Sequence, residues 1–385
     1  MEISIKPPLL SVVIPTKNRY EYLEILLKKL STLESSEFEV IIQDNSDNNN
    51  DFLQYLELLD DKRVKYFYKS GWISVIDNCD LAVGNATGKY ICMIGDDDGI
   101  LIEPALRLLD YLESSKIDAA IVNPLSYTWP DTNHIVWDSL SGRAFFKKFS
   151  MTYKILDSKT ELEKVIGKGG SFGLNKLPRI YHGFVRRNVL EMLKKDTGTY
   201  FPGPSPDMAN AVGLSNYLSE YLYADFPIII SGQGKKSTGG QGSEKQHHGR
   251  IENQSHLPKD TASKWSDKIP YFWSGPTIYA ESLRRALIAT GRKDNLNYSF
   301  LYAVCLVYER QYLKEIWKVV FGNKNFLNCI MTLFLILYYI FITVMQRLET
   351  FIKNIVQYKI MKQNNFVACD IQEVIVKSND FFYKN

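Results

Sequence analysis

Short apolar runs rich in β-branched residues alternate with helix-like segments through the first third of this 385-residue chain. The apolar runs lie at 10–15, 38–43, 64–68 and 90–94, and between them apolar residues recur at the spacing of amphipathic helices. Strands that alternate with helices form a parallel sheet, because right-handed crossovers carry the chain back over the faces of the sheet. The alternation therefore predicts an α/β fold with a mostly parallel sheet flanked by helices.

Polar residues follow three of the predicted strands at the point where each strand ends. In open parallel sheets, ligands bind beyond the carboxyl ends of the strands. One polar loop is common and is usually structural, but three that meet at one edge predict a binding site. No GxGxxG or GxxxxGK[ST] sequence occurs in this region, so a dinucleotide site and a P-loop are both disfavoured. The polar residues are Thr16, Asn18 and Arg19 after the first strand, Asp44 and Asn45 after the second, and Asp96, Asp97 and Asp98 after the fourth.

The three successive carboxylates after the fourth strand, Asp96, Asp97 and Asp98, are the most unusual of these groups. Adjacent carboxylates repel one another, so a cation is expected beside them. A hard divalent metal with oxygen ligands is the natural partner. Taken alone, the three acids are equally compatible with an acidic, solvated turn.

Composition restricts the class of protein. A hydrophobic content of 45% and a charged content of 23% are ordinary for a globular protein, and a net charge of +3 does not indicate a nucleic-acid partner. The five cysteines lie far apart without a CxxC pair, which argues against a disulfide framework or a zinc site and favours a reducing compartment. Glu2 and Lys6 interrupt the first residues, so we expect no secretory signal.

Three segments together resemble a family 2 glycosyltransferase of the GT-A fold. They lie at 10–19, 39–46 and 86–98 and read LSVVIPTKNR, EVIIQDNS and ATGKYICMIGDDD, and both their order and their spacing match the family. The resemblance implies a GT-A catalytic domain and an enzyme that moves a sugar from a nucleotide-diphosphate donor, of the UDP or GDP type, to an acceptor hydroxyl. It also implies a divalent metal, Mg²⁺ or Mn²⁺, on the diphosphate.

The resemblance assigns donor contacts to the strand ends. Pro15, Thr16 and Arg19 fall where the first loop of the family touches the nucleotide. Asp44 falls where the family places the carboxylate that hydrogen-bonds the base. The predicted donor contacts are Pro15, Thr16, Asn18, Arg19, Asp44, Asn45, Asp96 and Asp97.

The acid cluster falls on the metal-binding DxD sequence of the family. A metal bridging the diphosphate stabilises the charge that develops on the leaving group. The family commonly has Asp-x-Asp-Asp, and Gly95 occupies the first of those positions here. Asp97 and Asp98 are the preferred metal ligands, although the sequence leaves open which two of the three acids bind the ion.

Two residues further along the chain are candidates for the acceptor side. Asp207 follows a proline-rich loop and opens a predicted helix, where an acid is favoured by the helix dipole. The resemblance places at this position the general base, which a direct, inverting displacement needs opposite the leaving group. His182, in a predicted strand at 180–187, either faces the acceptor or is a structural histidine.

Two irregular stretches complete the predicted catalytic domain. The aromatic stretch 126–149 is expected to line an acceptor groove or to fill the core. Residues 232–242, rich in Gly, Lys and Ser, follow a predicted strand at 226–231 and indicate a mobile loop. In the family this segment often closes over the donor, and the alternative is a surface linker. The candidates for contacts to the diphosphate or metal are Lys235, Lys236 and His248.

The predicted catalytic domain covers 1–250, with a donor half to about 115, and a mainly α-helical region covers 251–385. Residues 326–345 carry no charge. Twenty residues at about 1.5 Å each span about 30 Å, the thickness of a bilayer's hydrocarbon core. Basic residues on both flanks give no clear orientation. A membrane span and a buried helix are the alternatives to the preferred interpretation, a helix lying in the interface of the cytoplasmic leaflet.

These patterns predict a metal-dependent glycosyltransferase at the cytoplasmic face of the cytoplasmic membrane. Its acceptor would be a glycan or a lipid-linked oligosaccharide of cell-surface polysaccharide biosynthesis. One alternative is a nucleotidyltransferase that forms sugar nucleotides, but such enzymes usually need a glycine-rich first loop, and 16–19 contains no glycine. The other is a non-catalytic sugar-nucleotide or glycan-binding protein, against which the intact acids argue.

Overall fold

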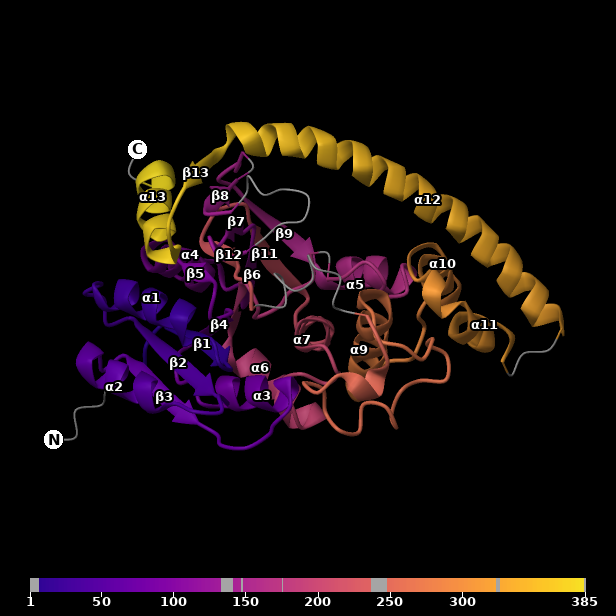
Figure 1. Ribbon diagram of the computed structural model, residues 1–385, viewed down its shortest axis with the longest axis horizontal. Helices are drawn as coiled ribbons and strands as arrows, with labels where there is room; N and C mark the ends of the chain where they lie inside the picture. The colour runs from indigo at the N-terminus through magenta and orange to yellow at the C-terminus, as the bar shows by residue number, and fades with distance from the viewer. Residues whose placement is uncertain are drawn as a thin grey trace.

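The computed structural model describes residues 7–132, 141–146, 148–174, 176–236, 248–322 and 326–383. Within these residues the chain forms two sheets with helices packed around them (Figure 1). The larger sheet has the order β3 (Val64–Tyr68), β2 (Phe38–Asp44), β1 (Leu10–Thr16), β4 (Tyr90–Met93), β10 (Gly183–Arg186), β6 (Ala119–Val122), β11 (Glu220–Ala224) and β9 (Tyr153–Asp157). The smaller sheet has the order β13 (Asn365–Val367), β8 (Arg143–Phe145), β7 (Leu125–Thr128), β12 (Ile229–Gln233) and β5 (Gly99–Ile100).

The four strands predicted in the first third are present and parallel. β1 pairs with β2 on one side and with β4 on the other, and β2 pairs with β3. The register places Leu10 opposite Phe38 and Thr16 opposite Asp44. The carboxyl ends of β1 and β2 are therefore level, which brings their polar residues to one edge as the sequence predicts.

Helices cover both faces of this sheet because successive strand residues point to opposite sides. Val12 and Ile14 face one core and Val13 faces the other. The first core is covered by α1 (Tyr20–Ser31), α2 (Asn50–Leu59), α4 (Ile102–Ser115) and α13 (Ile371–Tyr383). The second core is covered by α3 (Val75–Gly84) and α6 (Arg187–Thr197). The predicted α/β class, with a mostly parallel sheet between helices, is confirmed.

A separate helical layer with its own apolar core adjoins the sheets. The region predicted to be mainly α-helical does contain several helices, and α12 (Phe326–Gln363) continues well beyond the end of the uncharged segment at 345. Figure 1 shows α12 arching from beside α10 and α11 to β13. The other members of the layer are α5 (Ser158–Gly167), α7 (Pro206–Leu214), α9 (Gly275–Ala289), α10 (Tyr298–Tyr308) and α11 (Leu313–Phe321).

The described parts of 126–149 differ from the prediction of an irregular stretch, because they include β7 residues and β8. The segments β9, α5, β11, β13 and α13 were not predicted either. The strands among them have three to five residues and are fixed by distant partners rather than by a local pattern, as when β13 pairs with β8. Residues 133–140 and 147 lie outside the described residues. The division of the chain at 250 stays a prediction, although β13 and α13 pack against the sheets.

Candidate functional site

Asp96 joins the first strand-end loop to the acid cluster. Its Oδ2 accepts a hydrogen bond from Thr16 Oγ1 at 2.7 Å and pairs with Arg19 Nε at 2.9 Å. Its Oδ1 is buried without a hydrogen-bond partner among the described residues. Buried polar atoms are rarely unpaired in folded proteins. The structure therefore brings three predicted donor-site residues together and leaves one carboxylate oxygen available to a cation.

Asp98 is held by the surrounding protein. Its Oδ2 lies 2.7 Å from the Gly95 amide, 2.7 Å from His182 Nε2 and 3.2 Å from the Tyr181 hydroxyl. Its Oδ1 accepts a hydrogen bond from the Gly232 amide at 2.8 Å. Burial opposes ionisation, but the neighbouring His182 and these hydrogen bonds hold the pKa of Asp98 below its usual range. This carboxylate is thus ionised, and most of its hydrogen-bonding capacity is occupied.

The other two carboxylates carry negative charge that the protein balances poorly. Burial, and then the charges of Asp98 and Asp96, raise the pKa of Asp97 to about 7. Burial also raises the pKa of Asp96 to about 6, although Arg19 opposes this shift. Burial is the main cause of both shifts, and Arg19 offsets it only in part. A divalent cation would supply further positive charge, so the acid cluster fits a metal.

The acid cluster fits a metal that is shared with a substrate better than a metal held by protein alone. Within the described residues, no group of three or more His, Cys, Asp or Glu side chains is arranged to hold an ion. Mg²⁺ is usually bound by one or two carboxylates together with substrate phosphates and water. The predicted pair of ligands, Asp97 and Asp98, stays a prediction, and the unpaired oxygen belongs to Asp96.

Two glycines allow the acid turn, residues 95–98, and the end of β12 to pack closely. A Cβ on Gly95 would lie 3.0 Å from Asp97 Oδ1 and 3.1 Å from Asp98 Oδ2. The absence of an acid at position 95 therefore has a steric reason in this chain. A Cβ on Gly232 would lie 1.8 Å from the Asp97 carbonyl oxygen, and the amide of Gly234 donates to Asp97 Oδ2 at 2.9 Å.

We expect Gly232→Ala to destabilise the folded protein by about 2 kcal/mol or more, because its methyl group would overlap the backbone of the acid turn. Urea unfolding followed by circular dichroism measures the effect. Gly275→Ala, at the start of α9, is the matched control, because a Cβ there meets no atom within 4 Å. Equal unfolding midpoints for the two variants would contradict the close packing of β12 against the acid turn.

Asp44 is buried at the end of β2 and already has three hydrogen-bond donors. Its Oδ2 accepts from the Tyr20 and Tyr66 hydroxyls at 2.5 and 2.6 Å, and its Oδ1 accepts from the Ser46 amide at 2.7 Å. Burial and the hydrogen bond to Asp44 raise the pKa of both tyrosines. Any contact from Asp44 to a base would add to this network, and the contact stays a prediction.

The remaining predicted donor-site residues connect the strand ends. The Asn45 amide donates to the Thr16 carbonyl oxygen at 3.1 Å, and Asn18, which has a φ of 57°, receives a hydrogen bond from the Asp47 amide at 3.0 Å. Pro15 lies in β1 opposite Gln43. These contacts show how the first and second strand-end loops support each other, but not that any of them binds a ligand.

Asp207 lies in the first turn of α7, where it interacts electrostatically with Asp98 of the acid cluster. Its side chain is surrounded by protein yet keeps partial solvent exposure. Burial raises the pKa of Asp207, Asp98 adds to the shift, and His182 and Arg179 oppose it. The raised pKa gives the carboxylate an enhanced affinity for protons, which suits a general base, and that role stays a prediction.

His182 contacts the acid cluster rather than lying in a remote part of the core. It is buried, its φ is 56°, and its ring stacks on that of Tyr181 at a centroid distance of 4.1 Å. Its amide donates to the Met93 carbonyl oxygen at 3.0 Å, next to the hydrogen bond from its ring to Asp98. Contact with an acceptor stays a prediction.

The predicted lid residues pair with groups outside the acid cluster. Lys236 Nζ lies 2.6 Å from Glu21, and His248 Nδ1 lies 3.0 Å from Glu309. The Lys235 amide donates to Asp131 at 3.4 Å. The rest of the predicted loop, 237–247, lies outside the described residues, and contacts from these three side chains to diphosphate or metal stay predictions.

Sequence reasoning missed several supporting residues of the site. The Trp129 indole donates to the Asp97 carbonyl oxygen at 2.9 Å, and Tyr20, Tyr66, Gly232 and Gly234 contact the acids as described above. The sequence shows that 126–149 is aromatic, but it does not predict which residues these side chains contact. Nothing in the local sequence around Gly232 indicates that its amide meets residue 98.

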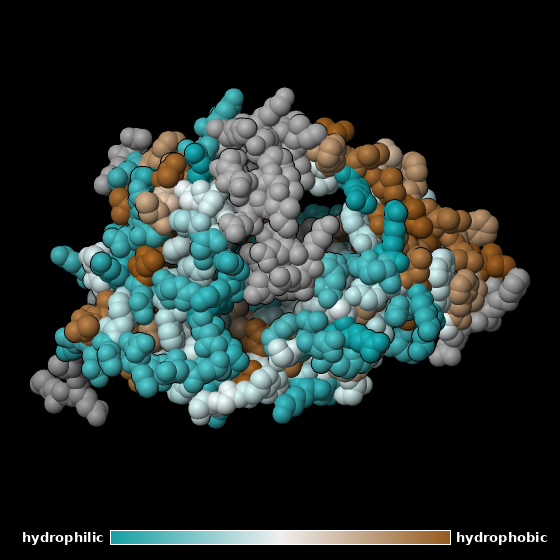
Figure 2. All heavy atoms as spheres, in the orientation of Figure 1, coloured by the Kyte–Doolittle hydropathy of each residue, from teal (hydrophilic) through white to brown (hydrophobic). Residues whose placement is uncertain are grey.

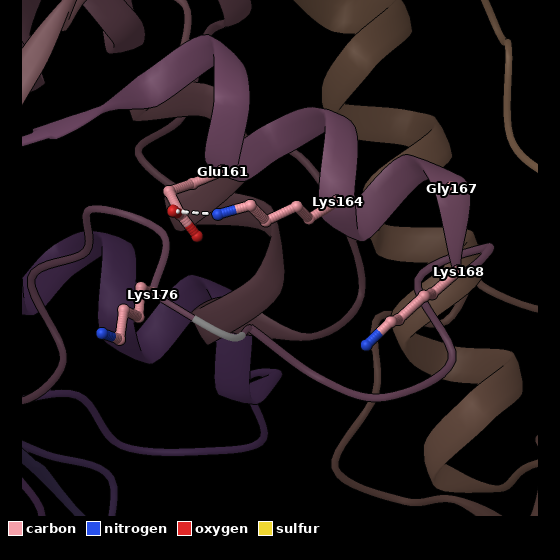
Figure 3. Close-up of a pocket in the computed structure, with 5 residues that line it drawn as sticks. All are labelled: Glu161, Lys164, Gly167, Lys168 and Lys176. Carbon is pink, nitrogen blue, oxygen red and sulfur yellow. Dashed lines mark hydrogen bonds and ion pairs between the residues drawn. The ribbon is translucent and has the colours of Figure 1, made fainter. Parts of the chain in front are cut away.

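A cavity of ≈ 550 Å³ lies beside α5 (Figure 3). In Figure 3 the side chain of Lys164 points toward Glu161, with which it forms an ion pair of 2.6 Å. None of the lining residues is a predicted site residue, so we assign this cavity no part in the candidate site. The lining residues are Glu161, Lys164, Gly167, Lys168 and Lys176.

Residues 11–176 match the family described as "Glycosyl transferase family 2". A curated relative, the GalNAc(5)-diNAcBac-PP-undecaprenol beta-1,3-glucosyltransferase of Campylobacter jejuni subsp. jejuni serotype O:2, is 34% identical over 100 residues. The matched part covers 24% of this chain and 31% of the relative, so this chain matches about a third of the relative's length.

Solved structures show weaker likeness. TarS 1-349 of S. aureus in complex with UDP-GlcNAc gives a TM-score of 0.48 at 12% identity, over 82% of this chain and 76% of that chain. The mannosyltransferase PcManGT from Pyrobaculum calidifontis, in complex with GDP-Man and Mn²⁺, gives a TM-score of 0.39 at 14% identity, over 83% of this chain and 89% of that chain. The match at residues 11–176 is thus the firmest of these similarities.

Proposed function

We propose that this chain, whose residues 11–176 belong to glycosyl transferase family 2, transfers a sugar from a nucleotide-diphosphate donor to an acceptor hydroxyl. One observation carries the proposal. Three buried carboxylates follow one another at the end of the parallel strands, and Asp96 among them contacts the Thr16 and Arg19 side chains and keeps one oxygen unpaired. A site of this kind attracts a divalent cation together with the phosphates of a donor.

For the metal we favour Asp96 and Asp97 over the predicted pair Asp97 and Asp98. The unpaired Oδ1 of Asp96 and the raised pKa of Asp97 support this choice, whereas Asp98 already accepts hydrogen bonds from its neighbours. When bound, Mg²⁺ or Mn²⁺ would stabilise the negative charge on the diphosphate leaving group. Asp98 would instead fix the acid turn against the residues just before β10 and the end of β12.

On the acceptor side, Asp207 would act as the general base of a direct displacement that inverts the sugar. In its ionised form it would accept the proton of the acceptor hydroxyl while that oxygen attacks the sugar carbon. The raised pKa of Asp207 supports the role, because a base of higher pKa is better matched to a weakly acidic hydroxyl. Arg179 and His182 oppose the shift and would favour the ionised form of the carboxylate.

For the acceptor we propose a glycan carried on a lipid, used at the cytoplasmic face of the cytoplasmic membrane in cell-surface polysaccharide biosynthesis. The name of the curated relative describes a glucosyltransferase for a PP-undecaprenol-linked glycan. The apolar helix α12 supports a location at the membrane, because it is long and apolar enough to interact with lipid.

We expect the purified chain to hydrolyse one UDP- or GDP-sugar slowly in the presence of Mn²⁺ and to stop when EDTA is added. A panel of nucleotide sugars, with release of nucleoside diphosphate as the signal, measures this. In parallel, the matching diphosphate at about 100 times its Kd should raise stability by about 2.7 kcal/mol, and only with metal. Stabilisation by no nucleotide would refute the proposal, and release of pyrophosphate from a nucleoside triphosphate and a sugar phosphate would indicate a nucleotidyltransferase.

A further inference from the structure

We propose that α12 docks the protein onto an anionic lipid bilayer by lying along its surface. In this arrangement the first part of α12 and the chain that follows it both stay packed against the same folded domain. The proposal extends the membrane location proposed above. It concerns binding rather than transfer, so each can fail without the other. It replaces the three alternatives for 326–345, a span, a surface helix and a buried helix, by one arrangement.

The helix exposes an unusually large apolar face. Phe334 is 70% exposed, Phe341 64% and Leu327 69%, and no charged residue occurs between positions 326 and 346. Among the α12 side chains that the structure describes, up to residue 353, Ile336 is buried in the apolar core of the helical layer and Thr343 is buried as well. Figure 2 shows apolar atoms gathered along the edge of the molecule where α12 runs. A helix with this exposure is not the core helix of a soluble domain.

The width of the face favours lipid over a second copy of the chain. Paired helices bury a narrow seam and carry charged residues at the positions that flank it. Here Leu335, Leu337, Val344 and Phe351 at the flanking positions are apolar and exposed, and the charged flanking residue Glu349 comes only near the end of the seam. The seam itself consists of Leu327, Met331, Phe334, Tyr338, Phe341, Met345, Leu348 and Ile352.

Cationic and aromatic residues adjoin the apolar face, as expected for the interface of an anionic bilayer. Arg347 and Lys353 follow the uncharged stretch and are exposed. The neighbouring helix α11 packs beside α12 and carries the exposed Lys318 together with Trp317, whose ring stacks on Phe321. These groups suit the headgroups of an anionic bilayer, and within the protein Lys353 pairs with Glu349 while Arg347 lies over the Tyr308 ring.

The first part of α12 is attached to the helical layer. The Tyr339 ring packs against Phe300 of α10 at a centroid distance of 5.1 Å, and the Tyr339 hydroxyl accepts a hydrogen bond from Asn297 at 3.0 Å. The chain after α12 is attached to the sheets. β13 pairs with β8, Arg143 Nη1 donates to Asn365 Oδ1 at 2.7 Å, and Ile371 of α13 is fully buried in the first core.

These two attachments are incompatible with a membrane span. A helix that crosses the bilayer separates its two ends by a hydrocarbon core about 30 Å thick. That separation would place β13 and α13 on the opposite side from β8, and the hydrogen bonds and buried contacts between them would be lost. An α12 that lies in the plane of the surface keeps every one of these contacts and still buries its apolar face.

Vesicle flotation tests the proposal. We expect the wild-type chain to float with vesicles of phosphatidylglycerol and phosphatidylcholine, and to float less with phosphatidylcholine alone. Phe334→Glu combined with Phe341→Glu should reduce the bound fraction by about tenfold or more, because two charges would enter the apolar face. Leu58→Glu, at the 87% exposed Leu58 on α2, is the matched control and should bind like the wild type. Donor hydrolysis without vesicles should be unchanged in all three proteins.

A wild-type chain that does not float, or a double variant that floats as well as the wild type, would overturn the proposal. The proposal would also be overturned if light scattering found a dimer in the wild type and a monomer in the double variant, while neither protein bound vesicles in the flotation experiment. The topology has its own readout in the exposed Cys369, which lies between β13 and α13. With vesicle-bound protein, an impermeant maleimide should label Cys369 from outside. Protection of Cys369 until detergent is added would indicate a span instead.

Discussion

Asp97→Asn is expected to reduce kcat/KM for sugar transfer by about 10³-fold or more while leaving the metal-free protein at least as stable as the wild type. The loss of activity follows from the proposed metal site. A metal on the leaving diphosphate supplies several kcal/mol of stabilisation, and each 1.36 kcal/mol corresponds to about a tenfold change in rate. Asparagine has nearly the shape of aspartate and keeps an oxygen to accept the Gly234 amide. It cannot, however, carry the charge that holds the cation.

The stability of this variant follows from the sign of the pKa shift. Burial and then the charges of Asp98 and Asp96 raise the pKa of Asp97 to about 7 in the folded chain, against about 3.9 in an unfolded one. Between these two values the folded state binds the proton more tightly, so the wild type loses stability as pH rises from about 4 through 7. Asparagine does not ionise, so the variant should keep its stability over this range. In EDTA at pH 8, its melting temperature should be about 2 °C or more above that of the wild type.

The experiment pairs turnover with thermal unfolding at pH 5 and pH 8. Asp267→Asn is the matched control, because Asp267 is exposed in the C-terminal helical region and should change neither quantity. Normal turnover by Asp97→Asn would rule out Asp97 as a metal ligand. Lost turnover together with a lower melting temperature at pH 8 would mean that the carboxylate supports the fold rather than the cation.

The parallel part of the sheet could be predicted because local sequence encodes it. Each of the first strands is a run of apolar residues long enough to be recognised, and the helices between them carry a clear apolar stripe, as in α1. The smaller sheet could not be predicted. β5 has two residues and β8 has three, and their conformations depend on partners such as β12 and β13. Local periodicity contains no information about such pairings.

The same distinction applies to the candidate site. The order of the strands alone predicts that the residues after them lie at one edge of the sheet. The contact between Thr16 and Asp96 agrees with that prediction. The groups that hold the acids come from far along the chain, as with the Gly232 amide on Asp98 and the Trp129 indole on Asp97. Sequence patterns predict which side chains carry chemistry, whereas their supporting contacts require the folded chain.

Asp207→Asn is expected to lower kcat by about 10² to 10⁴-fold and to leave donor affinity unchanged, because general-base catalysis contributes about that much. Asp207 would touch the acceptor proton rather than the donor. Its folded pKa lies above the usual range because of burial and Asp98, so wild-type kcat should fall as pH decreases through that raised pKa. The residual activity of the variant should lack this acid limb, since asparagine does not titrate.

The alternative role of Asp207, an acid that interacts favourably with the helix dipole, makes a different prediction. It would contribute only about 0.3 to 1 kcal/mol to stability and nothing to kcat. Glu103→Gln provides the comparison, because Glu103 is an exposed acid in the first turn of α4.

Single-turnover kinetics, a pH profile of kcat and calorimetric donor binding separate the cases. If Asp207→Asn loses donor binding together with turnover, the carboxylate belongs to the donor site. If it behaves like Glu103→Gln, it acts on the helix alone. Loss of kcat and of the acid limb, with intact donor binding, is the combination that only a general base produces.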